Sequence, residues 1–427
     1  MAKGLVIAAP HSGSGKTLVT LGLLRALKNR GVKVVSAKAG PDYIDPGFHA
    51  AATGQPCINL DCWAMGEASV LNIALSHSAE ADLLLVEGVM GLFDGPQGAK
   101  GSTADLAEAL RLPVLLVVDA AKQSQSIAAL VEGFRSFRPS LDLAGVILNR
   151  VASDRHEAML REALAAIDVK AFGALRQIDS LNLPSRHLGL VQAQENQQLE
   201  AFIETAAAGV SRETILDMIH ESAVDLENHV QSAAQILPPL GQSIAIARDE
   251  AFGFAYPHIL GGWSRLGAEL RFFSPLADEP PPAAEAVFLP GGYPELHAGK
   301  LAANTRFLDG LRNFKGLIYG ECGGYMALGD GLIDANGQRH AMAGLLPLTT
   351  SFAKRKLHLG YRQLQPFTGP WMQPLRGHEF HYSTIEAQGG GEQLFSAKDA
   401  AGNDLGSLGQ RVGNVMGSYA HIISVAP

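Results

Sequence analysis

The stretch LVIAAPHSGSGKT, Leu5–Thr17, decides the fold of the first part of this chain. Leu5–Ala8 is a short apolar run typical of a buried strand, and leucines recur at helical spacing after Thr17. A glycine-rich turn that joins a strand to a helix and ends in Gly-Lys-Thr is typical of a phosphate-binding P-loop. Pro10 replaces the first glycine of the usual pattern, so a glycine-rich turn with a chance Gly-Lys-Thr is the alternative.

A P-loop predicts how its residues contact ATP. Glycines let the backbone N–H groups face the phosphate oxygens, and the positive end of the following helix adds to the attraction. Lys16 would reach the outer phosphates, and the hydroxyl of Thr17 would ligate Mg²⁺. The residues predicted to bind the nucleotide are Ser12, Gly13, Ser14, Gly15, Lys16 and Thr17.

The composition is that of a globular protein with more than one domain. The chain has 427 residues, of which 47% are hydrophobic and 18% are charged, and this length predicts two or three domains. A net charge of −8 argues against broad binding to nucleic acid or anionic membranes. Because no run of about 18 apolar residues and no targeting segment is visible, we expect a cytoplasmic protein without a membrane span. The cysteines, Cys57, Cys62 and Cys322, make no disulfide framework, which also fits a reduced cytoplasm.

Residues 1–234 alternate apolar runs with helical patterns and are assigned to one P-loop α/β domain. Nearly continuous apolar strands with helices between them predict a parallel sheet with right-handed crossovers. Functional loops should then follow the carboxyl ends of the strands. From about Glu195 to Gln231 we expect polar amphipathic helices. The predicted strands after the first are Lys33–Ala39, Leu83–Val86, Val114–Val118 and Ala144–Leu148.

A second α/β domain is predicted for residues 243–427. Residues 235–242 contain the prolines and the glycine of a linker. The predicted strands beyond this linker are Ser243–Ala247, Leu270–Phe273, Ala286–Leu289 and Gly316–Tyr319.

Polar side chains follow several strands of the first domain. Asp42 and Asp45 lie on a loop shaped by glycine and proline, where two carboxylates could help to hold Mg²⁺ near the terminal phosphate. Glu87 ends an apolar strand, which is the form of a Walker-B-type metal site. Asn149 follows another strand and is placed to read a base edge. The alternative for the acids is a helix cap or a solvated turn.

The second strong signal is Gly320–Gly324, which follows an apolar strand and reads G-x-C-x-G. Small residues allow a sharp turn that lifts the thiol of Cys322 above the sheet at a helix N-terminus, where the thiolate is favoured. The N–H of Gly323 is one predicted oxyanion donor, and the glycines of Leu289–Glu295, Gly292 among them, offer the second. A buried structural cysteine is the alternative.

A thiol nucleophile also needs a base. His421 lies near the end of the chain, which fits an order in which the nucleophile comes before the histidine. His378 and His381 are also downstream of Cys322. A structural histidine is the alternative. The predicted catalytic residues of this domain are therefore Cys322, His421, Gly292 and Gly323.

Together these motifs resemble the cobyrinic acid and hydrogenobyrinic acid a,c-diamide synthase family. The resemblance implies an ATP-binding domain similar to dethiobiotin synthetase, fused to a class I glutamine amidotransferase domain with a flavodoxin-like α/β fold. Class I amidotransferases usually carry His-x-Glu, but Ile423 stands two residues after His421. A Cys–His dyad, or an orienting group from elsewhere, is therefore expected. The resemblance covers nearly the whole chain and rests on Ser12–Thr17, Gly40–Pro46, Glu87–Gly95, Leu289–Glu295, Gly320–Gly324 and Gly377–Ser383.

The resemblance also implies the reaction. ATP phosphorylates a carboxylate of a corrinoid, Cys322 releases ammonia from L-glutamine through a thioester, and ammonia displaces the phosphate. The a and c side chains become amides in cobalamin biosynthesis. ATP and Mg²⁺ are the implied cofactors. The residues implied to line the acyl-phosphate site are Asp42, Tyr43, Ile44, Asp45, Glu87 and Asp94, with Thr17, Asp42 and Glu87 as Mg²⁺ ligands.

The implied partners are small molecules. The corrinoid is a polycarboxylate, and Lys354–Arg362 offers four basic residues and an aromatic as a cationic surface, with a solvated basic loop as the alternative. No nucleic-acid or membrane partner is expected, and a homodimer is left open.

Other functions share some of these motifs. The same chemistry on another tetrapyrrole, as in nickel sirohydrochlorin a,c-diamide synthase, uses the same two sites. The loop Asp42–Pro46 and the shorter chain argue against a cobyric acid synthase. The intact elbow argues against a P-loop regulatory ATPase with an inert amidotransferase-like module. The sequence also leaves open whether the acceptor carries cobalt.

Overall fold

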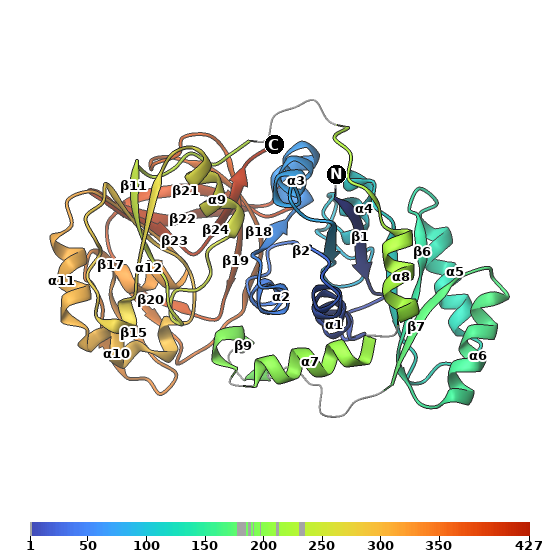
Figure 1. Ribbon diagram of the computed structural model, residues 1–427. Coiled ribbons are helices and arrows are strands. Elements are labelled where there is room, and N and C mark those ends of the chain that lie inside the picture. Colours follow the sequence, from blue (N-terminus) through green and yellow to red (C-terminus); the bar gives the residue numbers. More distant parts are fainter. Residues whose placement is uncertain are drawn as a thin grey trace. The chain divides into compact units, whose positions relative to one another are not determined.

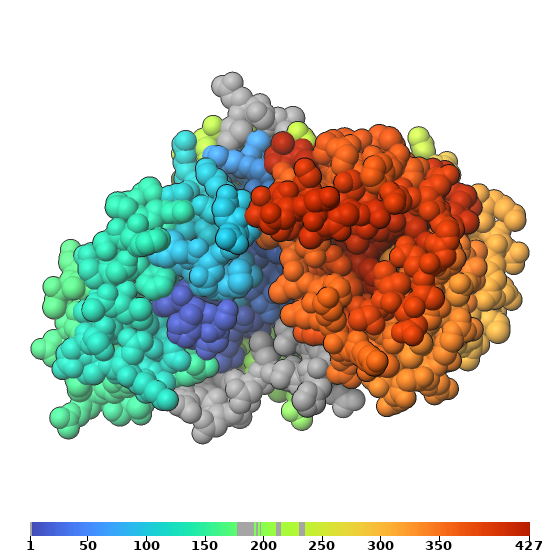
Figure 2. Space-filling view, turned by 180° about the vertical axis from the view of Figure 1, so that it is seen from behind, coloured from blue at the N-terminus to red at the C-terminus, as the bar shows by residue number. Residues whose placement is uncertain are grey.

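The chain forms two compact units, each described by itself. A computed structural model (Figure 1) describes residues 2–176, 185–186, 189–190, 192–196, 198–210, 213–229 and 235–427. The first unit comprises Met1–Pro96 and Lys100–Ala234, and the second comprises Gln97–Ala99 and Gln235–Pro427. The colours of the space-filling view follow the same order along the chain (Figure 2). None of the described helices combines the length and the hydropathy that crossing a bilayer requires.

The first unit is built on a parallel sheet, as the sequence predicts, and the structure gives the strand order β3-β2-β4-β1-β5-β6-β7. The short strand β10 (Val224–Asp225) pairs antiparallel with β1. The strands β3 and β7 were not predicted. The parallel strands are β1 (Lys3–Ala8), β2 (Val34–Ala39), β3 (Cys57–Leu60), β4 (Leu83–Glu87), β5 (Val114–Asp119), β6 (Leu143–Val151) and β7 (Ala171–Arg176).

Helices connect and cover these strands. Helix α1 packs so closely on α7 that a Cβ on Gly22 would lie 2.6 Å from the carbonyl oxygen of Ala206. The amphipathic helices predicted after Glu195 are present as α7 and α8, while residues 197, 211–212 and 230–231 of that stretch lie outside the described residues. The helices are α1 (Lys16–Asn29), α2 (Asp45–Thr53), α3 (Cys62–His77), α4 (Thr103–Leu110), α5 (Ile127–Phe137), α6 (Asp154–Ala165), α7 (Leu199–Val210) and α8 (Glu213–Ser222).

The second unit contains a ten-stranded mixed sheet with order β12-β11-β13-β14-β23-β22-β21-β18-β19-β24. Its parallel part comprises β12 (Glu269–Phe273), β11 (Ser243–Ala247), β13 (Ala286–Leu289), β14 (Leu317–Glu321) and β23 (Val415–Ser418). Its antiparallel part comprises β22 (Asp404–Val412), β21 (Glu392–Lys398), β18 (His358–Pro366), β19 (Leu375–His381) and β24 (His421–Val425).

A smaller sheet and four helices complete the second unit. The smaller sheet has the order β16 (Arg339–Ala341), β15 (Gly329–Ile333), β17 (Leu346–Ser351) and β20 (Thr384–Gln388). The helices are α9 (Pro257–Arg265), α10 (Ala298–Ala303), α11 (Thr305–Asn313) and α12 (Gly323–Leu328). The strands β11 to β14 agree with the sequence prediction, whereas β23, the antiparallel strands and the smaller sheet were not predicted.

Candidate active sites

The P-loop runs from β1 to α1, as predicted. Gly13 and Gly15 have φ angles of 83° and 84°, in the left-handed region that glycine enters without steric cost. A Cβ on Gly15 would lie 2.1 Å from Nδ2 of Asn149. That amide donates a hydrogen bond to the carbonyl of Ser14 at 2.9 Å. Asn149 therefore supports the P-loop, and its contact with a nucleotide base stays a prediction.

Lys16 lies beside the loop that follows β4. Its Nζ donates to the carbonyl of Met90 at 3.4 Å. Burial, followed by the charge of Lys38, lowers the pKa of Lys16 from 10.5 to about 8. A nucleotide phosphate next to this ammonium would favour its charged form.

Glu87 is the centre of a buried charge network at the end of β4. One carboxylate oxygen accepts from Thr17 Oγ1 at 2.6 Å and from Lys38 Nζ at 2.9 Å, and the other lies 2.6 Å from Nε2 of His49. Although burial favours the neutral acid, Lys38 and His49 hold the pKa of Glu87 well below its usual value. Lys38 also pairs with Asp45 at 2.5 Å. Two predicted residues, Thr17 and Glu87, are therefore in direct contact, and Lys38 and His49, which were not predicted, are further partners of Glu87.

The loop after β2 brings a third acid to this network, because Asp42 lies 3.9 Å from Nζ of Lys38. Asp42 Oδ1 accepts the backbone N–H groups of Ile44 at 2.8 Å and Asp45 at 3.2 Å. Burial, followed by the charge of Asp45, raises the pKa of Asp42 to about 6. Tyr43 and Ile44 are half-buried in the same loop. Close carboxylates and a hydroxyl are the hard oxygen donors that Mg²⁺ prefers, so this donor set fits the predicted metal.

The loop after β4 lies against the P-loop. Leu92 donates its backbone N–H to the carbonyl of Ala9 at 2.8 Å, and a Cβ on Gly91 would lie 2.6 Å from the carbonyl oxygen of Pro10. Asp94 accepts the N–H of Gly91 at 2.9 Å. Asp94 thus shapes the loop that faces Lys16.

Cys322 occupies a sharp turn between β14 and α12. Its φ of 45° and ψ of −104° are strained for a residue with a side chain, as a nucleophile elbow requires. A Cβ on Gly324 would lie 1.9 Å from the carbonyl oxygen of Leu289, so only glycine fits this close approach. The strand, turn and helix of the predicted elbow are therefore present.

The thiolate of Cys322 is not favoured at this turn, contrary to the prediction from sequence. Burial, followed by the charge of Glu295, raises the pKa of the Cys322 thiol above its usual value. The N–H of Gly323 acts in the opposite direction but does not outweigh burial. The thiol is thus protonated in this state and depends on a base.

The predicted oxyanion donors and the predicted base are neighbours. A Cβ on Gly323 would lie 3.0 Å from the backbone nitrogen of Gly292, and a Cβ on Gly291 would lie 2.2 Å from Cε1 of His421. His421 is buried at the start of β24, where it pairs with His378 of β19. Burial, followed by His378 and His381, lowers the pKa of His421 to about 3.

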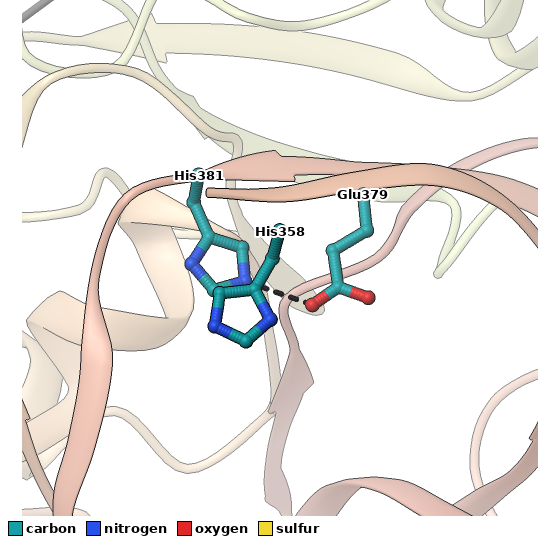
Figure 3. A group of neighbouring side chains, drawn as sticks. All are labelled: His358, Glu379 and His381. Atoms are coloured by element: carbon teal, nitrogen blue, oxygen red, sulfur yellow. Dashed lines mark hydrogen bonds and ion pairs between the residues drawn. The ribbon is translucent and has the colours of Figure 1, made fainter. Parts of the chain in front are cut away.

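A second polar network lies on β18 and β19 (Figure 3). Glu379 accepts from Arg362 Nε at 2.7 Å, and its other oxygen lies 2.8 Å from Nε2 of His381. Nδ1 of His381 lies 3.0 Å from Oγ of Ser383. The ring of His358 stacks on His381 with 4.7 Å between centroids.

This network also borders the elbow, because Sγ of Cys322 lies 4.0 Å from the carbonyl oxygen of Phe380. Ligand atoms of His358, Glu379 and His381 lie within 4.8 Å of one another, which is close enough to suggest a metal. However, Arg362 and Ser383 occupy the remaining atoms of Glu379 and His381, so these groups are satisfied by the protein itself. We therefore describe it as an ion-pair network.

This pairing corrects the predicted cationic surface. Arg362 is held by Glu379 and its side chain is only 12% exposed, so it does not join that surface. Lys354, Arg355 and Lys356 are exposed in the loop before β18 and form the remaining basic patch.

Two site residues that were not predicted nevertheless have a signal in the sequence. Lys38 stands within the otherwise uncharged strand Val34–Ala39, and Glu321 ends the strand before Cys322. A charged residue in a strand that should be buried on both faces indicates a buried partner. His49 lies in a helix, where its burial gave no comparable signal.

Two family models match the chain. The CobQ/CobB/MinD/ParA nucleotide binding domain covers residues 5–191, and the CobB/CobQ-like glutamine amidotransferase domain covers residues 243–426. The fold and the two sites thus define a nucleotide-binding domain joined to a glutamine amidotransferase domain.

Full-length relatives define the family further. A protein named hydrogenobyrinate a,c-diamide synthase from Sinorhizobium sp is 56% identical to this chain, and the match covers 99% of both chains. A protein of the same name from Brucella anthropi is 55% identical, over 99% of this chain and 98% of the relative. The relative of that name from Mesorhizobium japonicum is 47% identical over 100% of this chain and 99% of its own. The chain belongs to the hydrogenobyrinate a,c-diamide synthase family.

Two solved structures are similar at a low level. Chloroplast FtsY from Physcomitrella patens has a TM-score of 0.33 and 19% identity over 48% of this chain and 65% of that chain. A glutamine amidotransferase has a TM-score of 0.26 and 19% identity over 37% of this chain and 80% of that chain.

Proposed function

We propose that this chain is a glutamine-hydrolysing ligase that converts the a and c carboxylates of hydrogenobyrinate into amides in cobalamin biosynthesis. The observation that carries this function is the full-length identity to relatives named for that reaction. A P-loop domain and an amidotransferase domain in one chain supply the two half-reactions that such a ligase needs.

The first half-reaction activates a carboxylate with ATP. The P-loop and Lys16 would hold the phosphates and stabilise charge on the transferring phosphoryl group. Thr17, Asp42 and Glu87 would hold Mg²⁺, which supplies further charge neutralisation at the γ-phosphate. Asp45 and the loop around Asp94 would line the acceptor side. The contact between Thr17 and Glu87 and the ion pairs of Lys38 with Asp42 and Asp45 bring these groups together, which supports this arrangement.

The second half-reaction releases ammonia from L-glutamine. His421 would take the proton of Cys322, and the thiolate would attack the side-chain amide to give a thioester and ammonia. The N–H groups of Gly323 and Gly292 would stabilise the oxyanion. The high pKa of the buried thiol supports a requirement for this base.

A competition between acceptors tests the function. Purified protein would be incubated with ATP, Mg²⁺, glutamine and an equimolar mixture of hydrogenobyrinic acid, cobyrinic acid and nickel sirohydrochlorin, with products identified by mass spectrometry. We expect hydrogenobyrinic acid a,c-diamide to form fastest. Preferred amidation of nickel sirohydrochlorin would contradict the proposed acceptor, and ATP hydrolysis without any amide would contradict the ligase.

A further inference from the structure

The strand that carries the predicted base lacks the usual orienting carboxylate. The residue two positions after His421 is Ile423, which has no polar atom in its side chain. The structure places a different carboxylate at the imidazole, because Oε2 of Glu321 lies 4.0 Å from Nδ1 of His421. Hydrogen bonds at catalytic sites are often long without substrate and shorten when it binds.

Glu321 is fixed between the two strands that carry the reacting groups. It is the last residue of β14, directly before Cys322, and its side chain is 6% exposed. Its Oε1 accepts the backbone N–H of Ile422 on β24 at 3.1 Å. One oxygen is thus anchored to the strand of His421, which holds the other oxygen toward the ring.

The surroundings explain why such a carboxylate matters. His421 pairs with His378 of β19, lies within electrostatic range of His381 and Glu379 on the same strand, and hydrogen-bonds to the backbone of Phe254. Burial lowers the pKa of His421 to about 3 and raises that of Glu321 to about 8, because burial disfavours either charge alone, whereas an imidazolium and a carboxylate side by side each favour the charged form of the other. When the imidazole accepts a proton, the buried positive charge needs a negative neighbour.

We infer that Glu321 is the positioning residue of the thiol–imidazole pair. It orients His421 through Nδ1 and stabilises the imidazolium that forms when the proton of Cys322 moves to the ring. The carboxylate therefore comes from the strand of the nucleophile instead of the strand of the base. This assignment rests on the glutaminase half of the proposed function.

The substitution Glu321→Gln tests this role with little structural change, because the amide oxygen can still accept the N–H of Ile422. We expect glutamine-dependent kcat to fall by about 100-fold while KM for glutamine stays within about threefold, since the residue acts on proton transfer and not on substrate binding. The variant Glu321→Asp keeps the charge, so its glutamine-dependent kcat should be about tenfold higher than that of Glu321→Gln. Ammonia-dependent amidation reports whether the rest of the protein is intact.

Alkylation of Cys322 by iodoacetamide gives a readout that is independent of turnover. The pH profile of the alkylation rate should shift to higher pH in Glu321→Gln, because the imidazolium of the thiolate–imidazolium pair has lost its negative neighbour. Glu269→Gln is the matched control, since it removes an exposed carboxylate that pairs with Arg271 on β12. We expect that control to keep the wild-type profile.

Two outcomes would overturn the inference. One is a Glu321→Gln variant with wild-type kcat and a wild-type alkylation profile. The other is an equal loss of glutamine- and ammonia-dependent activity with a lower melting temperature, which would make Glu321 a structural residue. The glutaminase half of the proposed function is tested separately, because it fails only if the wild-type protein does not hydrolyse glutamine.

Discussion

At the residue scale, the charge of Lys16 links nucleotide binding to pH. Its pKa is lowered to about 8 by burial and by Lys38, whereas a bound phosphate would raise it. Because binding favours the protonated amine, we expect proton uptake on ATP binding at about pH 8.5, and weaker affinity as the pH rises above 8. Calorimetry in buffers with different ionisation enthalpies measures this uptake.

Two lysine variants provide the controls for this prediction. Lys16→Met should bind ATP without proton uptake, whereas Lys28→Met, at an exposed position in the last turn of α1, should behave as the wild type. Equal uptake by the wild type and Lys16→Met would assign the proton to another group.

Lys38 is predicted to be essential for the stability of the first unit. Its ammonium neutralises Glu87 and Asp45 inside the protein. The substitution Lys38→Met therefore leaves both carboxylates without this ion-pair partner. We expect this variant to lose about 3–5 kcal/mol of stability, measured by hydrogen exchange of peptides from β2 and β4. The double variant Lys38→Met/Glu87→Gln should recover part of that loss. Unchanged exchange in the single variant would contradict the prediction.

At the element scale, the elbow depends on the contact between α12 and β13. An alanine at Gly324 would place its Cβ 1.9 Å from the carbonyl oxygen of Leu289, and backbone cannot move aside as a flexible side chain does. We expect Gly324→Ala to cost about 1–3 kcal/mol and to reduce glutamine-dependent turnover by about 100-fold, because it displaces the loop with Gly292. Thermal unfolding and glutaminase assays measure both effects.

Gly299→Ala is the matched control for this substitution. It lies in α10, where the closest atoms to a new Cβ belong to the ring of His340 at 3.6 Å or more. Such a helical glycine should tolerate alanine or gain about 0.5–1 kcal/mol. If both variants lowered the melting temperature equally, close packing at the elbow would not be the cause.

The elements that could be predicted from sequence are those with local signals. Continuous apolar strands such as Leu83–Glu87 and the glycine-rich turns identified most parallel strands of both sheets, but not β3, β7 or β23. The strands β18 to β22 contain many polar residues, which weakens the apolar signal of a strand. The pairing of β14 with β23 and of β19 with β24 joins segments that lie far apart along the chain, so it has no local signal.

The same reasoning applies to the sites. Lys16, Thr17 and Cys322 belong to short motifs with fixed spacing. The partner of Thr17 is Glu87, which is 70 residues away, and the acid facing His421 is 100 residues before it. These contacts arise only when strands are placed side by side, so spacing along the chain could not predict them.

At the scale of the whole molecule, the two units should separate ammonia production from its use. We expect Cys322→Ala to lose glutamine-dependent amidation and to keep amidation with added ammonium salt at raised pH, because the thiol only supplies ammonia. Amide formation measured with each nitrogen source tests this. Lys16→Ala should lose both activities, since no acyl phosphate forms. Equal loss of both activities in Cys322→Ala would contradict the division of labour.

The last prediction concerns how two carboxylates use one phosphorylation site. The sequence contains one P-loop, so the a and c side chains must reach the same γ-phosphate in turn. The macrocycle therefore has to be repositioned between the two reactions, and the simplest route is release and rebinding. The exposed basic residues Lys354–Lys356 would permit this. Their flexible charged side chains attract carboxylates without holding the macrocycle in one orientation.

Mass spectrometry of an early time course should then show free monoamide before diamide, with two ATP consumed per diamide, one for each carboxylate activated. A chase with isotopically distinct hydrogenobyrinic acid should trap labelled monoamide in solution, because the released intermediate competes with fresh substrate for the site. If diamide formed from the first turnover and the chase trapped no monoamide, release would be ruled out. The macrocycle would then have to turn while it stays bound to the protein.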